Sequence, residues 1–206
     1  MSLQIVNLGL PKTGTTTLAR ALRLAGYRVA DHRIRARQDA ARAGQYVADL
    51  LYRGRFEADD PGAFLAPFQA LTETSLLREG RSLWPQMDYG LIDAIRRTYP
   101  KVKFLASRRD PFALSQSMLA WSDLGTARLP QAAIPGLPPG FGDTTKQRIQ
   151  WIEAQNRFLD DIFLGDPDFL AFDIADPKAP AQISAHLGRK LPWWGRKNRN
   201  DLNRVA

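Results

Sequence analysis

Short apolar runs alternate along the chain with longer stretches in which apolar residues recur every three or four positions. The short runs predict buried strands, and the longer stretches predict helices with one face turned inward. The predicted strands are residues 5–8, 27–30, 64–71, 103–106 and 169–172. The predicted helices are residues 16–25, 36–51, 89–98, 111–121, 144–163 and 179–187. This alternation predicts an α/β fold of three layers, with a central, mostly parallel sheet of about five strands.

One segment departs from this alternation. Residues 125–142 contain four prolines and four glycines, which are too many for regular structure in a connection of that length. We interpret the segment either as a lid or acceptor-site loop, or as a surface insertion without a role.

A glycine-rich segment follows the first predicted strand. Residues 9–17 read Gly-Leu-Pro-Lys-Thr-Gly-Thr-Thr-Thr and lead into the first predicted helix. In that order, backbone N–H groups converge on one point at the helix N-terminus and favour a phosphate or sulfate. The expected fold is therefore P-loop NTPase-like, or nucleotide-kinase-like. A Walker A loop has its lysine directly after the second glycine. Here Thr15 takes that place and Lys12 lies inside the loop, which indicates sulfate transfer rather than phosphate hydrolysis.

A second polar group follows the fourth predicted strand. The chain reads Ser-Arg-Arg-Asp-Pro from residue 107 and reaches Ser117 eight residues after Arg109. An arginine at the end of a strand and a serine in the next helix can bind one anion from two elements, and together they suit a phosphate monoester. Alternatively, Arg-Asp-Pro is an ordinary helix start with a surface ion pair.

Together, the two segments resemble the cytosolic-type sulfotransferases, which use 3′-phosphoadenosine 5′-phosphosulfate (PAPS) as their donor. The family's loop for the 5′-phosphosulfate reads Pro-Lys-Ser/Thr-Gly-Thr-Thr, which the chain matches throughout with Pro11, Lys12, Thr13, Gly14, Thr15 and Thr16. The family's 3′-phosphate motif has an arginine at a strand end and a serine eight residues later, as Arg109 and Ser117 are. The motifs stand in the family's order about ninety residues apart, so the resemblance covers most of the chain.

The resemblance implies a role for each matching residue. Lys12 would stabilise the charge that develops as the S–O bond of the donor breaks. The backbone of residues 13–16, with the hydroxyls of Thr15 and Thr16, would hold the 5′-phosphate, and Arg109 and Ser117 would hold the 3′-phosphate. Because a sulfonate carries fewer charges than a γ-phosphate, the lysine can act where kinases use Mg²⁺, and no metal is expected.

The acceptor has to lose a proton, so we expect a general base near the sulfonate. Many relatives use a histidine after the third strand, but neither histidine of this chain, His32 or His186, lies there. Glu73 stands at the corresponding place and is the first candidate. Asp31 and His32, at the end of the second predicted strand, are the next. Each of the three is alternatively a surface or capping group.

The chain departs from the family at two further places. Thr17 stands where many relatives have a tryptophan that stacks on adenine; the candidate replacements are Trp84, Trp121, Trp193 and Trp194. The C-terminal Arg-Lys-Gly segment of the family has two loose analogues, at residues 188–190 and 196–197.

Composition bounds the class of protein. With 206 residues, of which 44% are hydrophobic, the chain is expected to form one domain over residues 1–206. No apolar run approaches about 18 residues, so no membrane span is expected. The absence of cysteine excludes disulfides and thiolate chemistry. The first residues lack a signal-peptide pattern, so a cytoplasmic protein is expected.

A formal charge of +8 implies a polyanionic or multiply phosphorylated partner. The basic stretches match no nucleic-acid-binding pattern, so a small-molecule, carbohydrate or lipid acceptor is expected instead of nucleic acid. Arg33, Arg35 and Arg37 either favour an acidic acceptor or are plain surface. Two alternatives to a sulfotransferase remain: a P-loop small-molecule kinase of the nucleotide type, and a non-catalytic polyanion-binding relative. The sequence sets neither the acceptor nor the oligomeric state.

Overall fold

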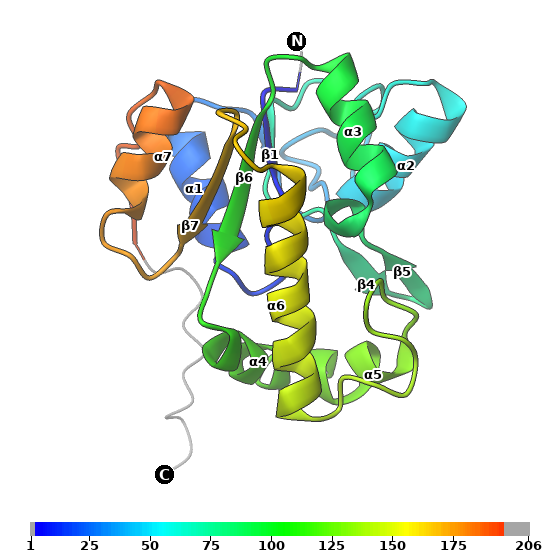
Figure 1. Ribbon diagram of the computed structural model, residues 1–206. Coiled ribbons are helices and arrows are strands. Elements are labelled where there is room, and N and C mark those ends of the chain that lie inside the picture. Colours follow the sequence, from blue (N-terminus) through cyan, green and yellow to red (C-terminus); the bar gives the residue numbers. More distant parts are fainter. Residues whose placement is uncertain (1–2, 196–206) are drawn as a thin grey trace.

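The computed structural model describes residues 3–195 and contains a five-stranded parallel sheet of order β2-β3-β1-β6-β7 (Figure 1). Strand β1 lies at the centre, paired with β3 on one side and β6 on the other, with Ile5 opposite Ala70 and Val6 opposite Phe104. The predicted α/β fold with a five-stranded parallel sheet is confirmed. The strands are β1 (Ile5–Asn7), β2 (Val29–Ala30), β3 (Ala70–Leu71), β6 (Lys103–Arg108) and β7 (Phe169–Asp173).

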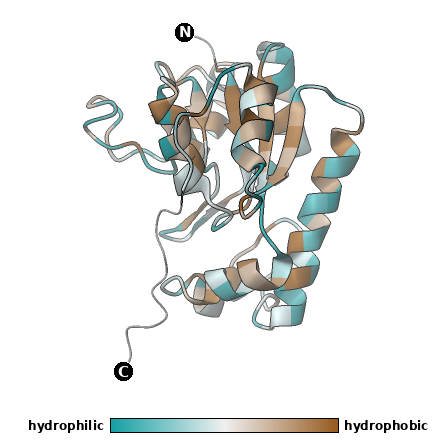
Figure 2. Ribbon diagram, turned by 90° about the vertical axis from the view of Figure 1, so that its left-hand side faces the viewer, coloured by the Kyte–Doolittle hydropathy of each residue, from teal (hydrophilic) through white to brown (hydrophobic). Residues whose placement is uncertain are grey.

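Helices cover both faces of the sheet because strand side chains alternate between the faces. Ile5 and Leu105 pack against helices on one face, and Val6 and Phe104 pack against helices on the other. Figure 2 shows the long helix α6 alternating between hydrophilic and hydrophobic residues, as expected for a helix with one buried side. The first face carries α1 (Thr15–Leu24) and α7 (Ala179–Leu187). The second carries α2 (Val47–Glu57), α3 (Tyr89–Thr98) and α6 (Thr145–Ile162).

Several short elements lie beyond the carboxyl ends of the strands (Figure 1), and their buried side chains form a separate hydrophobic cluster. Trp84 and Trp151 meet edge to face at its centre, with ring centroids 5.5 Å apart. The buried side chain of Arg148 fastens this region to α6, because it donates to Ser115 Oγ at 2.9 Å and to the carbonyl of Gly142 at 2.8 Å. The elements around the cluster are β4 (Leu76–Arg78), β5 (Arg81–Leu83), a short 3₁₀ helix (Pro85–Met87), α4 (Pro111–Leu119), a π-helix (Leu124–Arg128) and α5 (Leu129–Gln131).

Three of the predicted elements are wrong. The helix predicted over residues 36–51 begins only at Val47, because residues 34–45 close a loop in which the N–H of Gly44 donates to the carbonyl of Ile34 at 2.8 Å. The strand predicted over residues 64–71 is limited to Ala70–Leu71, and turns that include Pro67 precede it. The segment 125–142, predicted to be irregular, contains most of the π-helix and all of α5, because Leu129, Ile134 and Leu137 are buried in the cluster around Trp84.

Gly9 is packed too tightly for a side chain. A Cβ atom at this position would lie 2.2 Å from Ser107 Oγ and 2.5 Å from the backbone oxygen of Ser107. We expect Gly9→Ala to lower the free energy of unfolding by about 1–3 kcal/mol, measured by urea denaturation, because β1 and β6 would have to separate.

Gly90→Ala is the matched control. Gly90 lies exposed in the first turn of α3, where the nearest atom to an added Cβ is 3.4 Å away, so this change should be neutral or stabilising. Equal losses in the two variants would contradict the close packing of Gly9.

Candidate active site

A cleft of about 1050 Å³ opens at the carboxyl ends of the strands. Segments that follow all five strands of the sheet line it, so residues far apart in the sequence meet there. From β1 the chain first builds β2 and β3 on one side of the sheet and then crosses to β6 and β7 on the other side. Ligands of α/β sheets usually bind at the carboxyl ends of the strands where the strand order reverses in this way. The lining segments are residues 11–17 after β1, 31–35 after β2, 73–78 after β3, 109–121 after β6 and 174–177 after β7.

The loop after β1 is held from behind by buried hydrogen bonds. Thr13 Oγ1 donates to the carbonyl of Leu10 at 2.6 Å and lies 2.7 Å from Ser107 Oγ. Asn7 donates to Ser107 Oγ at 3.1 Å and accepts from the backbone N–H of Ser107 at 3.0 Å. Positive φ angles at Lys12 (74°) and Gly14 (89°) turn the chain into α1. The front of the loop, with the N-terminus of α1, therefore faces the cleft.

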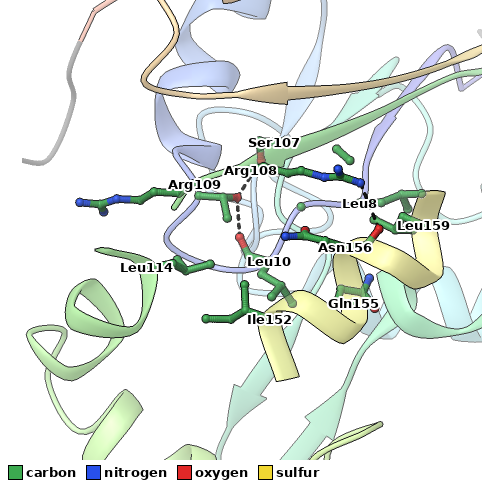
Figure 3. A pocket seen from close by; sticks show the side chains of 13 residues that line it. Leu8, Leu10, Ser107, Arg108, Arg109, Leu114, Ile152, Gln155, Asn156 and Leu159 are labelled. Atoms are coloured by element: carbon green, nitrogen blue, oxygen red, sulfur yellow. Dashed lines mark hydrogen bonds between the residues drawn. The ribbon is translucent and has the colours of Figure 1, made fainter. Parts of the chain in front are cut away.

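The small cavity of Figure 3 lies behind this loop. Its volume of about 10 Å³ leaves room for at most about one water molecule. The figure also separates two neighbouring arginines. Arg108 points toward α6, where it pairs with Asp160 at 2.5 Å and donates to the carbonyl of Asn156 at 3.1 Å. Arg109 points the opposite way, and its side chain lines the large cleft.

Lys12 is a partly buried cation in the cleft. Its Nζ lies 3.4 Å from the ring centroid of Trp121, a cation–π contact. Burial and the positive charge of Arg109 together lower the pKa of Lys12 to about 8, while the charge of Glu73 acts in the opposite direction. An anion bound beside Lys12 would favour its charged form.

Glu73 is a buried carboxyl group beside the loop. Thr15 Oγ1 donates to its Oε2 at 3.0 Å, and Ser75 Oγ donates to its Oε1 at 2.6 Å. Burial raises the pKa of Glu73 to about 7, although both hydrogen bonds and the charge of Lys12 favour the ionised form. A carboxyl group that titrates near neutral pH can accept a proton from a substrate at little free-energy cost.

The structure brings nearly all predicted site residues to this one cleft. The exception is Thr13, whose side chain faces the cavity behind the loop. The predicted residues that line the cleft are Pro11, Lys12, Gly14, Thr15, Thr16, His32, Glu73, Arg109 and Ser117.

The two other candidates for the general base differ in their surroundings. Asp31 is held in ion pairs with Arg23 at 2.9 Å and Arg35 at 3.1 Å. His32 packs edge to face on Tyr46, with centroids 5.2 Å apart, and burial lowers its pKa. Both line the cleft, but the charge of Asp31 is already neutralised within the protein.

The tryptophans proposed for adenine stacking lie in different places. Trp84 is 2% exposed and packs on Trp151, whereas Trp121 and Trp194 also line the cleft and are more accessible. Trp193 contacts the guanidinium of Arg20 at 4.4 Å. Of the two loose C-terminal analogues, Arg189 stacks on Tyr27 at 4.5 Å, and residues 196–197 lie outside the described residues.

Sequence reasoning missed several residues of the cleft. Ser75 follows Glu73 by two positions and is found only once the carboxyl group is known to be buried. Arg78 and Arg128 line the cleft from the unpredicted hairpin and π-helix. Within residues 3–195, we find neither a group of three or more metal-ligating side chains nor a helix suited to crossing a membrane.

The fold and the site define an α/β protein whose glycine loop after β1 carries a lysine inside the loop and faces a cleft. The model of the sulfotransferase domain family matches residues 4–165, which is well over half of the chain. The chain therefore belongs to the sulfotransferase domain family, and the resemblance inferred from its motifs is confirmed. The comparison with curated proteins gives no match.

The raised pKa of Glu73 makes the free energy of unfolding depend on pH, and this dependence can be measured. Between the ordinary pKa of 4.5 and about 7, the folded protein keeps a proton on Glu73 that the unfolded chain has lost. Stability from this group is therefore fully present below pH 4.5 and is lost as the pH rises through 7. Glu73→Gln removes this dependence, so between pH 5 and pH 8 the stability of the variant relative to the wild type should rise by about 2.5 kcal/mol.

Urea denaturation at the two pH values measures this difference. Glu153→Gln, a change of an exposed carboxyl group on α6, serves as the control and should show no such gain. A stability difference between Glu73→Gln and the wild type that stays constant with pH would mean that Glu73 titrates normally.

Proposed function

We propose that the protein transfers the sulfuryl group of PAPS to a hydroxyl or amine of a small-molecule, carbohydrate or lipid acceptor, without a metal ion. Membership of the sulfotransferase family supports sulfotransfer in general. The use of PAPS and the roles of single residues are supported by one observation: Lys12, Glu73 and Arg109 line the same cleft. These side chains supply a cation for the transferred group, a base for the acceptor and a cation for the far end of the donor.

The donor site follows from the loop and from Arg109. The N-terminus of α1 and the backbone of residues 13–16 suit the 5′-phosphosulfate, and the exposed Thr16 adds a hydroxyl at the cleft. Arg109 and Ser117 line the same cleft from the end of β6 and from α4 and suit the 3′-phosphate. The hydroxyl of Thr15 donates to Glu73, so we assign it to positioning the carboxyl group and not to the phosphate.

Glu73 and Lys12 would act on opposite sides of the transferred sulfur. The oxygen or nitrogen of the acceptor attacks sulfur while Glu73 takes its proton, and the bond from sulfur to the 5′-phosphate oxygen breaks. Lys12 stabilises the negative charge that forms on that oxygen, and 3′-phosphoadenosine 5′-phosphate (PAP) leaves. Thr15 and Ser75 hold both oxygens of Glu73, which fixes the direction in which the carboxylate accepts the proton.

The kinase alternative has less support. P-loop phosphoryl transfer uses a lysine directly after the second glycine of the loop, and Thr15 stands there. Since the hydroxyl of Thr15 is bound to Glu73, no feature of this position favours a nucleoside triphosphate.

Arg109 should recognise the 3′-phosphate. We expect Arg109→Ala to weaken binding of PAP about ten- to hundredfold, and binding of AMP, which lacks the 3′-phosphate, much less. Arg108→Ala is the matched control, because Arg108 points away from the cleft to Asp160. Isothermal titration with both nucleotides measures the difference. Equal losses for PAP and AMP would place Arg109 outside the 3′-phosphate site.

The proposed reaction is tested by release of PAP from PAPS in EDTA, with pooled phenols, sugars and amines as acceptors. We expect Lys12→Ala to lower this release about 10²–10³-fold while PAP still binds. The pH profile of kcat/KM should rise near pH 7 as Glu73 ionises and fall near pH 8 as Lys12 loses its proton. Lys12→Arg should remove the fall. Acceptor-dependent release that is the same in Lys12→Ala and the wild type would contradict the proposal.

A further inference from the structure

Three arginines near His32 form one wall of the cleft. Arg33 follows β2, Arg78 ends β4, and Arg128 ends the π-helix, and all three line the cleft. The charges of all three act on His32. After burial, the positive charges of Arg78, Arg128 and Arg33 are the causes that lower its pKa, and only Asp31 acts in the opposite direction.

The carboxylates near this wall neutralise it only in part. Asp31 is paired with Arg23 and Arg35, Asp123 is paired with Arg128 at 2.8 Å, and Glu79 lies 3.5 Å from Arg81. Among residues 3–195, no carboxylate lies within 4.0 Å of Arg33 or Arg78. Two guanidinium groups thus keep their positive charge on the cleft wall.

The guanidinium groups of Arg33 and Arg78 differ in their contacts with the rest of the protein. Arg33 Nε donates to the carbonyl of Gly44 at 3.0 Å, and its guanidinium lies over the ring of Tyr46 at 5.5 Å. Arg78 is exposed at the end of a hairpin strand. The terminal N–H groups of an arginine form a planar fork that matches the oxygens of a carboxylate, sulfate or phosphate.

This wall lies next to the proposed general base. The backbone N–H of His32 donates to the backbone carbonyl of Glu73 at 3.1 Å, so the chain next to Arg33 is bonded to the chain at Glu73. An acceptor whose anionic group is bound by these arginines would carry its reacting hydroxyl or amine toward Glu73 and the loop.

We propose that Arg78 and Arg33 bind an anionic group of the acceptor, so that the protein sulfates acceptors that already carry a carboxylate, sulfate or phosphate. The inference rests on the proposed function, and it narrows the acceptor to an anionic class. Arg128 has a supporting role, because its NH1 donates to the carbonyl of Leu77 at 2.8 Å and its charge is offset by Asp123. Arg37, which the sequence grouped with Arg33 and Arg35, is not among the residues that line the cleft.

The test measures binding of inorganic sulfate to the protein saturated with PAP, which occupies the donor site. Calorimetric titration is run at constant ionic strength, with chloride as the reference anion. We expect one sulfate to bind to this complex, and Arg78→Gln to weaken it at least about tenfold, because a charged hydrogen-bonding partner is lost. Arg97→Gln is the matched control, since Arg97 is exposed on α3 and pairs with Asp93. Sulfate that binds no better than chloride, or equally well to Arg78→Gln and the wild type, would overturn the inference.

Failure of the proposed function is recognised separately. If PAP does not bind, the donor assignment fails, and the same titration is made on the nucleotide-free protein. There the glycine loop supplies a second sulfate site, so Arg78→Gln should lower the number of bound sulfates by one. An unchanged number would overturn the acceptor-side site.

Competition with bound sulfate then identifies the anion. Methyl glucuronide carries a carboxylate, glucose 6-phosphate carries a phosphate, and methyl glucoside carries no charge. We expect one or both charged sugars to displace sulfate and the neutral sugar not to, and the stronger competitor indicates the class of acceptor. Displacement by methyl glucoside as strong as by the charged sugars would overturn the inference, because charge would then not determine binding.

Discussion

The close approach of Gly9 to Ser107 is the contact on which the arrangement of the site depends. It lets the hydroxyls of Thr13 and Ser107 lie 2.7 Å apart, and Asn7 binds both the backbone and the side chain of Ser107. These polar groups are buried, and each lost partner would cost about 1–3 kcal/mol, so the network favours one position of the loop. Since Arg109 follows Ser107 by two residues, the same network sets the spacing between the loop and Arg109.

A second constraint is the burial of opposite charges beside that loop. Burial disfavours the charged forms of both Lys12 and Glu73, which brings their pKa values to about 8 and about 7. Two groups that titrate near neutral pH suit a reaction in which one accepts a proton and the other stabilises a new negative charge. The hydrogen bond from Thr15 to Glu73 joins the loop directly to the carboxyl group, so in the proposed reaction donor binding and proton transfer would depend on the same few residues.

The sequence predicted what depends on local backbone geometry. The order of strand, glycine loop and helix at residues 5–24 and the strand that leads to Arg109 need only short-range patterns, and both are present in the structure. Glu73 was chosen as the first candidate base by its place after the third strand, even though that strand has only two residues. Its burial and its bond to Thr15 depend on packing between segments 58 residues apart, which no local pattern contains.

The side of the cleft that we propose for the acceptor was harder to predict because its elements are held by tertiary packing. The hairpin of β4 and β5 turns at Glu79 and Gly80, both of which have positive φ, and this short turn was the one local signal for it. Without the hairpin, Arg78 could not be assigned to the cleft. The helix predicted over residues 36–51 failed because polar turns at Asp39 and Gly44 interrupt it, and those turns bring Arg33 toward Tyr46.

The most direct test of the account is the thermal stability of the protein with PAP, ADP and ATP, each with and without Mg²⁺. A ligand at about a hundred times its dissociation constant should add roughly 2.7 kcal/mol to the stability of the folded state. The account predicts that PAP stabilises the protein far more than ADP or ATP at the same concentration, and that Mg²⁺ makes no difference. Stabilisation by ATP that requires Mg²⁺, with little effect of PAP, would contradict it.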